Sequence, residues 1–182
     1  RAKRCSYIPQ RSGIGIDISV LDVVLMGFNP QLGLLEHPSR QMVDQALLAL
    51  SQVGLGTMAH ANYLHLSEGQ KQLCILARTL VSGSKLLLLD EAFSALDYQT
   101  RVNVSRDVYN ILRSENQTMI MVTHDIPEAV SMSDRVIILS PRPAVIARQV
   151  DIPFGKTRDT IALRSTKEYR QCYETVWKEM SR

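Results

Sequence analysis

Apolar positions along the chain follow two different spacings. Short, nearly continuous apolar runs are typical of strands, and they occupy residues 5–8, 86–89, 118–122 and 135–139. Between these runs, apolar residues recur every three or four positions, which predicts helices over about 19–27, 39–53, 68–83, 98–113 and 127–132. Alternating strands and helices favour a doubly wound α/β fold. The four leucines at 86–89 predict a strand buried on both faces, as in parallel sheets.

Polar residues and glycines mark the ends of several predicted helices. Ser19, with Asp22 three positions later, fits an N-cap, and so does Ser67. Gly54 and Gly83 follow the last apolar positions of their helices and fit C-terminal stops.

The pattern changes after residue 140. Pro141 and Pro143 interrupt the chain, and residues 144–150 fit an antiparallel edge strand. From Lys167 onward, apolar residues such as Tyr169 and Val176 recur on one helical face. That face suits either docking on the body of the protein or contact with another subunit. We therefore expect a domain over 1–140, with a helical part at about 17–80, and a C-terminal extension over 141–182.

Composition excludes several classes of protein. The 182 residues are 45% apolar and 21% charged, as in an ordinary globular domain rather than a disordered chain. No apolar run is long enough to cross a bilayer. Three distant cysteines give neither a metal motif nor a disulfide framework. The net charge is +3, and we interpret the short basic cluster of Arg1, Lys3, Arg4 and Arg11 as a solvated edge rather than a nucleic-acid site.

Two adjacent carboxylates follow the leucine run. Asp90 and Glu91 end this strand, and open α/β sheets bind ligands at the carboxyl ends of their strands. Asp90 suits a Mg²⁺ ion with its water shell, and Glu91 suits the orientation or deprotonation of a water that attacks a phosphoryl group. Four aliphatic residues before Asp-Glu also occur at plain strand ends, so the pair alone decides nothing.

Two further stretches point to the same chemistry. At the start of a helix, the Ser67 hydroxyl and the backbone N–H groups of Glu68, Gly69 and Gln70 converge at the positive end of the helix dipole, which suits a phosphate. Gly69 permits close approach of the backbone. Taken alone, this stretch also fits a well-capped helix without a ligand. His124 follows the strand at 118–122, where a ligand of Glu91 would be within its reach.

Five motifs stand in order along the chain: YIPQ (7–10), LSEGQKQ (66–72), LLLLDE (86–91), SALD (94–97) and THD (123–125). With this order and spacing, the chain resembles the ATP-binding cassette (ABC) ATPases from its first residue to about 139. The resemblance implies an α/β fold that is a partial P-loop NTPase (RecA-like) core, built on a parallel sheet, with an inserted α-helical subdomain. It also implies ATP and Mg²⁺ as cofactors.

The resemblance assigns catalytic and metal-binding roles. Gln10 is similar to the glutamine that senses the γ-phosphate and Mg²⁺ and faces the membrane partner. Asp90 is similar to the metal-binding acid, Glu91 to the catalytic base, and His124 to the switch histidine that contacts the γ-phosphate.

Nucleotide-binding roles follow in the same way. Ser67, Gly69 and Gln70 match the signature motif, and Asp97 matches an aspartate that communicates across a dimer. The implied mechanism is a dimer closing over two ATP molecules, each held between one subunit's phosphate loop and the other's signature motif. The chain departs from the family at Glu68, where a glycine is common, and at Ala92, where a proline is usual. We expect these departures to tune the site rather than abolish it.

No phosphate loop of the form G-x-x-x-x-G-K-[ST] precedes Gln10. Either the sequence is an N-terminally truncated piece of a cassette that lacks this Walker A region, or it is a degenerate subunit that contributes only the signature side. Because Gln10, Glu91 and His124 are intact, we favour truncation and expect this fragment by itself to be inactive.

Two segments suggest different importers. Residues 17–50 resemble the metal-chelate, siderophore and cobalamin group, whereas residues 122–143, with the tail after them, resemble the nitrate, sulfonate and taurine group. We favour the first, because its segment faces the permease in importers. A non-transport ABC ATPase acting on nucleic acid or ribosomes is a further alternative. The importer interpretation predicts three partners and no nucleic acid: a second ABC ATPase subunit, a transmembrane permease and a substrate-binding protein. It predicts a peripheral location on the cytoplasmic face of the cell membrane.

Overall fold

The computed structural model describes residues 5–10, 13–33, 35–155 and 157–181. The basic residues Arg1, Lys3, Arg4 and Arg11 lie outside this range. The chain divides into two compact units, Arg1–Val122 and Thr123–Arg182. The boundaries that we expected at residues 140 and 141 stay a prediction.

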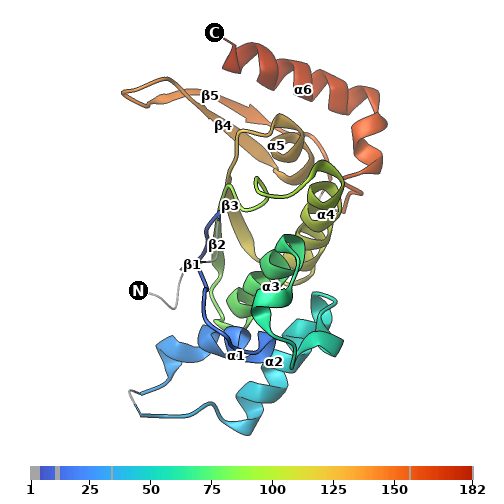
Figure 1. Cartoon of the computed structure of the whole chain (residues 1–182). Coiled ribbons are helices and arrows are strands. Elements are labelled where there is room, and N and C mark those ends of the chain that lie inside the picture. Colours follow the sequence, from blue (N-terminus) through green and yellow to red (C-terminus); the bar gives the residue numbers. More distant parts are fainter. Residues whose placement is uncertain (1–4, 11–12, 34, 156, 182) are drawn as a thin grey trace. The chain divides into compact units, whose positions relative to one another are not determined.

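The first unit is built on a parallel sheet of three strands in the order β1-β2-β3 (Figure 1). These strands, β1 (Cys5–Ile8), β2 (Leu86–Asp90) and β3 (Thr118–Val122), lie where the apolar runs predicted them. Ile8 pairs with Leu89, and Asp90 pairs with Val122. The carboxyl ends of all three strands therefore lie along one edge of the sheet.

Strand β2 differs from its prediction in one respect. Leu87 and Leu89 are fully buried, whereas Leu86 and Leu88 are only partly buried. The expectation of two buried faces was wrong for this unit. Helices α3 (Glu68–Val81) and α4 (Tyr98–Ser114) lie on the same side of the sheet, so its opposite face is less covered (Figure 1).

Helices α1 (Val20–Leu25), α2 (Arg40–Gln52) and α3 pack against one another to form the helical part of this unit. Ser19 and Asp22 form the predicted capping box at the start of α1. Gly54 and Gly83 adopt positive φ angles of 76° and 70° just beyond α2 and α3, a conformation that glycine adopts without strain. Helix α1 ends earlier than predicted, because the chain tightens into a 3₁₀ helix over Met26–Gln31.

The second unit contains α5 (Ile126–Met132), β4 (Arg135–Leu139), β5 (Ile146–Asp151) and α6 (Lys167–Met180). Strand β4 pairs antiparallel with β5, in the edge-strand arrangement expected for the residues after 140. The alternating pattern had suggested instead that β4 continues the parallel sheet. Antiparallel pairing closes only a short loop, so it costs little chain entropy.

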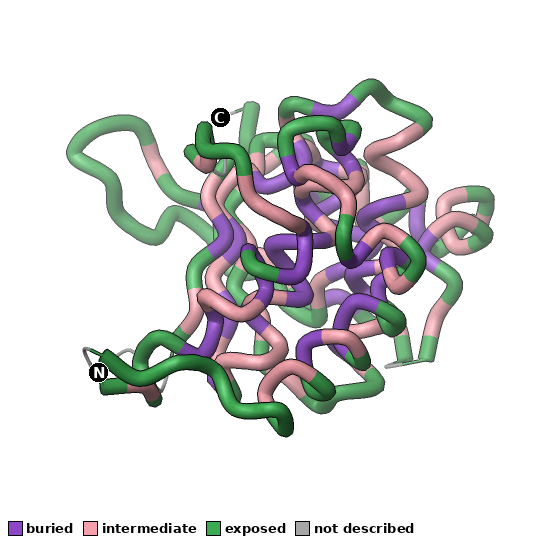
Figure 2. The backbone as a smooth tube through the Cα atoms, turned by 60° about the horizontal axis from the view of Figure 1, so that its bottom comes forward, coloured by how far each residue is buried: buried purple, intermediate pink, exposed green. Residues whose placement is uncertain are grey.

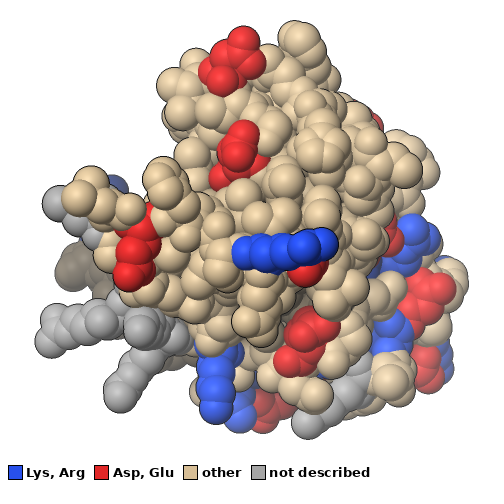
Figure 3. All heavy atoms as spheres, turned by 90° about the horizontal axis from the view of Figure 1, so that it is seen from below, with Lys and Arg blue, Asp and Glu red and all other residues tan. Residues whose placement is uncertain are grey.

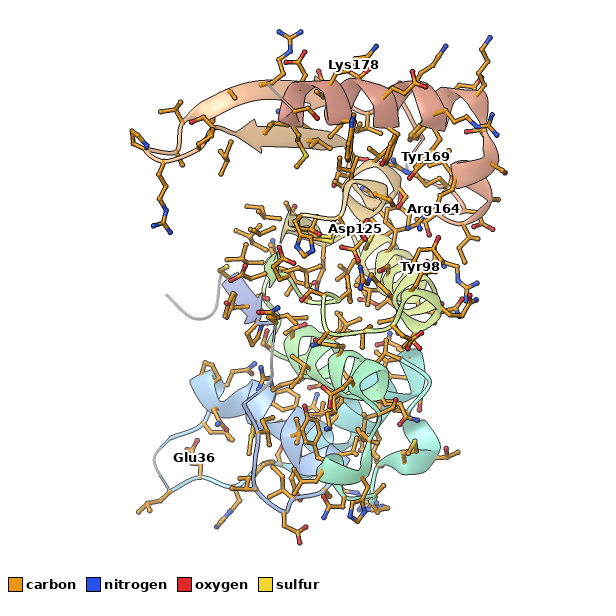
Figure 4. All side chains as sticks on the ribbon, turned by 45° about the horizontal axis from the view of Figure 1, so that its top comes forward. Glu36, Tyr98, Asp125, Arg164, Tyr169 and Lys178 are labelled. Carbon is orange, nitrogen blue, oxygen red and sulfur yellow. The ribbon has the colours of Figure 1, made fainter. Side chains whose placement is uncertain are left out.

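The apolar face of α6 packs partly within this unit. Tyr169 and Val176 join Ile126, Val130 and Ile138 in one buried cluster. Figure 4 shows Tyr169 pointing from α6 toward α5, whereas Lys178 projects from the opposite side of α6. Trp177 and Met180, on the predicted apolar face, remain 55% and 51% exposed. Docking therefore accounts for only part of this face.

Burial differs among the elements. Most of α1 and alternate residues of β2 are buried, whereas β5 is almost entirely exposed. Figure 2 shows buried, intermediate and exposed stretches alternating along the chain. In the part of the chain that the structure describes, no helix combines the length and the apolar character needed to span a membrane.

Candidate functional site

The carboxylate of Asp90 is held by the neighbouring strand. Asp90 is the last residue of β2, and the Tyr7 hydroxyl on β1 donates a hydrogen bond to its Oδ2 at 2.9 Å. This bond, with burial and the negative charge of Asp90 adding to it, raises the pKa of Tyr7 above its ordinary value. Tyr7 therefore stays a neutral donor over the physiological range and fixes one oxygen of Asp90.

Glu91 stands at a strained point of the backbone. Its φ angle is +51°, in the left-handed region that side chains other than glycine rarely adopt. Its N–H donates to the Val122 carbonyl at 2.9 Å, which continues the β2–β3 pairing by one residue. The chain then turns sharply, and the Ser94 N–H returns to the Glu91 carbonyl at 3.1 Å. Such strain is characteristic of functional sites and costs of the order of 1–3 kcal/mol.

Gln10 is joined to this same turn. Gln10 stands two residues beyond the Ile8–Leu89 pair, at the edge of the sheet where Asp90 and Glu91 lie. Its Nε2 donates to the Ser94 hydroxyl at 2.9 Å, and that hydroxyl donates to the Glu91 carbonyl at 2.8 Å. The structure thus brings together three of the predicted site residues within the first unit: Gln10, Asp90 and Glu91.

Ser67 caps α3, as predicted. Its Oγ accepts from the Gln70 N–H at 3.3 Å, and the Gln70 side-chain oxygen accepts from the Ser67 N–H at 2.9 Å. This reciprocal box engages the Gln70 N–H, which we had expected to be free. The N–H groups of Glu68 and Gly69 remain without intrahelical acceptors by their position in the first turn.

The carboxylate of Glu68, at the start of α3, forms a salt bridge. Its Oε1 lies 2.7 Å from Nζ of Lys71, which stands one turn further along α3. The exposed pair partly neutralises the charge that this departure from the family pattern brings to the helix start.

Gly69 is buried against α4. A Cβ atom added to Gly69 would lie 2.9 Å from Thr100 Cγ2 and 3.3 Å from Val104 Cγ2. The glycine is therefore needed for close packing of α3 on α4, in addition to any approach of a ligand.

Asp97 caps the N-terminus of α4. Its Oδ1 accepts from the Thr100 N–H at 3.0 Å. Hydrogen bonds from Thr100, through its side chain and then its backbone, hold the pKa of Asp97 below the ordinary value. Thr100 thus lies against Gly69 on α3 and also bonds to Asp97, two residues that the sequence analysis singled out.

His124 belongs to the second unit, in the turn between β3 and α5. The residues on either side of His124 shape this turn. Thr123 Oγ1 accepts from the Asp125 N–H at 3.0 Å and donates to Glu128 Oε2 at 2.9 Å, and Asp125 accepts from the Glu128 N–H at 3.0 Å. Figure 4 labels Asp125 at the start of α5.

The residues present fit Mg²⁺ bound together with a nucleotide. Mg²⁺ prefers oxygen ligands and usually binds through one or two carboxylates, water molecules and substrate phosphates. Asp90 offers a carboxylate and Gln10 an amide oxygen at the same edge of the sheet. Among the described residues, no group of three or more His, Cys, Asp or Glu side chains could hold a metal ion on its own. A carboxylate and an amide oxygen at one sheet edge suit an ion that also binds phosphates and water.

This arrangement defines an ABC-type ATPase domain, and comparison with known proteins agrees. The model of the ABC transporter family matches residues 1–94. The chain therefore belongs to the ABC transporter family.

Individual relatives extend the match beyond residue 94. An uncharacterized ABC transporter ATP-binding protein, YtlC of Bacillus subtilis, is 33% identical over 168 residues, which cover 90% of this chain and 62% of the relative. The aliphatic sulfonates import ATP-binding protein SsuB of Mycobacterium sp. (strain MCS) is 42% identical over 123 residues, covering 68% of this chain and 49% of that protein. The chain thus spans about half to two thirds of the length of these relatives.

A solved structure agrees with the fold. An ABC transporter described as metal-chelate type, in an inward-facing conformation, superposes with a TM-score of 0.74 at 26% identity, and the match covers 94% of this chain and 64% of that one. The P-loop NTPase fold that the motifs implied is confirmed.

The sequence analysis assigned no role to three residues that contribute to the site. Tyr7 and Ser94 lie inside quoted motifs but received no role, and Thr100 lies outside all of them. The parallel pairing of β1 with β2 could have predicted Tyr7, because Tyr7 pairs with Leu88 and its neighbour two residues along β2 is Asp90. Ser94 and Thr100 each have one near partner, Glu91 for Ser94 and Asp97 for Thr100, but the contacts of Ser94 with Gln10 and of Thr100 with Gly69 join distant parts of the sequence and have no local signal.

Proposed function

We propose that the complete protein is the ATP-binding and ATP-hydrolysing subunit of an ABC importer and powers solute uptake through a membrane permease. The observation that carries this proposal is the turn at the end of β2, where Glu91 is held in a strained conformation beside Asp90 and is linked through Ser94 to Gln10. A peripheral place on the cytoplasmic face of the membrane follows from this function.

In the proposed reaction Glu91 orients the attacking water and accepts its proton, while Gln10 contacts the γ-phosphate side of the substrate. For His124, the family resemblance is the basis for proposing a contact with the γ-phosphate. Mg²⁺, when bound at Asp90 and Gln10, supplies positive charge to the phosphate oxygens. Tyr7 keeps the Asp90 carboxylate oriented through its 2.9 Å hydrogen bond. Ser67, Gly69, Gln70 and Asp97 serve the nucleotide of the opposing subunit.

Two separate sets of neighbours support such a divided site. Asp90 and Glu91 are tied to β1 and β3 through Tyr7 and Val122, whereas the start of α3 is tied to α4 through Gly69. A closed dimer would bring the first set of one subunit to the second set of its partner. The partner is a second ABC ATPase subunit, identical or related.

Glu91→Gln in the complete protein tests the hydrolytic role. The amide cannot accept the proton, so the variant should bind ATP, dimerise in its presence and hydrolyse at least about a hundredfold more slowly. Glu115→Gln, on the exposed end of α4, is the matched control and should retain activity. Near-normal turnover in Glu91→Gln would remove Glu91 from the role of base.

Two classes of transported solute are proposed. A metal chelate, such as a siderophore complex or cobalamin, is favoured by residues 17–50 and by the metal-chelate type transporter that superposes on the chain. An organic sulfonate, or a related nitrate or taurine substrate, is favoured by the 42% identity to the sulfonate import protein SsuB. Deletion of the gene, followed by growth on a sulfonate as sole sulfur source or under iron limitation, separates them. A substrate-binding protein that selects the solute is the expected third partner.

A cassette ATPase that moves nucleic acid or ribosomes is the competing function. Nucleic-acid binding usually requires a surface rich in one sign of charge. On the face seen in Figure 3, acidic and basic side chains lie scattered among uncharged residues. Stimulation of hydrolysis by a permease in vesicles, and not by nucleic acid, would support the importer.

A further inference from the structure

The hydroxyl of Ser94 has two hydrogen-bond partners of different kinds. It lies 2.8 Å from the Glu91 carbonyl oxygen and 2.9 Å from Nε2 of Gln10. A serine hydroxyl has one hydrogen to donate, and a carbonyl oxygen can only accept. The hydrogen is therefore committed to Glu91, and Ser94 presents only lone pairs to Gln10.

This commitment determines which end of the Gln10 amide faces Ser94. The two ends of an amide are nearly equal in size, and only their hydrogen-bond partners distinguish them. Because Ser94 can only accept, the NH₂ group must face it, and Oε1 becomes the end directed elsewhere. Oε1 is the atom that can bind a cation, whereas the NH₂ group would repel it.

The main chain of Gln10 is also contacted from another element. The Gln72 side chain, which is buried on α3, lies with its Nε2 3.4 Å from the Gln10 carbonyl and so approaches the main chain of this loop from another element. The side chain of Gln10 then has Ser94 as its anchor on the turn that follows Asp90 and Glu91.

We propose that Ser94 is a positioning residue that holds the Gln10 amide with its oxygen available to the Mg²⁺ of a bound nucleotide. The proposal rests on the proposed function, since it assigns how one residue of that site is oriented. Ser94 touches neither the metal nor the phosphates. It acts through Gln10, by accepting the hydrogen bond that excludes the reversed amide.

The test measures metal dependence rather than turnover. A fluorescent ATP analogue is titrated into the complete protein without Mg²⁺ and then at increasing Mg²⁺, and Mn²⁺ binding is followed by electron paramagnetic resonance. In Ser94→Ala the affinity without metal should be unchanged, whereas the Mg²⁺ concentration for half-maximal effect should rise about tenfold, as for other residues that orient metal ligands. Ser94→Thr keeps the hydroxyl and should restore the wild-type value. Ser51→Ala removes a hydroxyl that donates to the Leu47 carbonyl within α2 and should change nothing.

The variant Asp90→Asn distinguishes failure of the role proposed for Ser94 from failure of the proposed metal site. If Asp90→Asn weakens the metal effect but Ser94→Ala does not, the metal site stands and the role of Ser94 is refuted. If neither variant alters the metal dependence, the proposed metal site itself is wrong. Equal losses in Ser94→Thr and Ser94→Ala would also overturn the proposal, because the hydroxyl would not be the active feature.

Discussion

Replacing Gly69 by alanine should damage the packing of α3 on α4. The added methyl carbon would lie 2.9 Å from Thr100 Cγ2 and 3.3 Å from Val104 Cγ2, and the first distance is shorter than real carbon contacts allow. Thr100 is β-branched and stiff at χ1, so its methyl group yields poorly. Overpacking of this kind costs roughly 1–3 kcal/mol, of which alanine's better helix propensity returns up to about 1 kcal/mol. We expect a net loss of up to about 2 kcal/mol in the free energy of unfolding.

A double-mutant cycle identifies the cause of this loss. Thr100→Ser removes Cγ2 but keeps the N–H that Asp97 caps and a hydroxyl in the same place. If packing is the reason for the glycine, Gly69→Ala combined with Thr100→Ser should recover at least about 1 kcal/mol relative to the sum of the single changes.

Urea unfolding of the complete protein measures the free energy of unfolding of each variant. ATP-dependent dimerisation measures whether the signature motif still functions. Recovery of both in the double variant is the expected result. The packing argument is refuted if Gly69→Ala unfolds like the wild type yet fails to dimerise, and Thr100→Ser restores nothing. Gly69 would then serve only the approach of a ligand.

Three further changes probe individual groups of the site. Glu91→Gly relieves the strain of the positive φ angle, so its free energy of unfolding should exceed that of Glu91→Gln by about 1 kcal/mol. Both variants should lose hydrolysis. Equal stability of the two variants would show that the backbone is not strained. Tyr7 has a raised pKa because it donates to Asp90, so its stabilising bond is complete below pH 10 and is lost as the pH rises through the folded-state value. Ultraviolet titration should therefore show one tyrosine shifting down in Asp90→Asn, and an unchanged titration would contradict the bond. Asp97 has a lowered pKa, so its contribution is complete above about pH 4 and is lost as the pH falls through the lowered value. The stability difference between the wild type and Asp97→Ala should shrink in acid, and a constant difference would count against the cap.

Much of the fold could be predicted because its signals are local. The strands at 5–8, 118–122 and 135–139 are short apolar runs, and each lies where its run predicted it. Ser19 and Ser67 cap their helices because a serine hydroxyl reaches the N–H three residues on, a geometry set within one turn. The identity of the family followed from motifs of this local kind.

The wrong predictions concern which elements pack against or pair with a strand. The leucines of β2 were expected to be buried on both faces, but burial depends on which helices cover each face, and the apolar pattern does not contain that information. The pairing of β4 with β5 likewise depends on which neighbour is nearest in space.

The candidate site shows the same limit. The sequence identifies Gln10, Asp90 and Glu91 by type and spacing. It does not show that Ser94 accepts from Gln10 across 84 residues, that Tyr7 donates to Asp90 across 83, or that Glu91 adopts a left-handed conformation. These features arise from parallel pairing and from the turn after β2, which only the folded chain brings together.

Subunit mixing tests the shared-site account most directly. Ser67→Arg and Glu91→Gln are each expected to inactivate a homodimer of the complete protein, because each defect then occurs in both sites. In a mixed dimer of these two variants, both defects fall in the same shared site and the other site is intact. Single-turnover ATP hydrolysis should therefore reappear on mixing, at roughly a quarter of the wild-type amplitude for random pairing. If each site lay within one subunit, every site would keep one defect, and mixing two inactive variants would restore no hydrolysis.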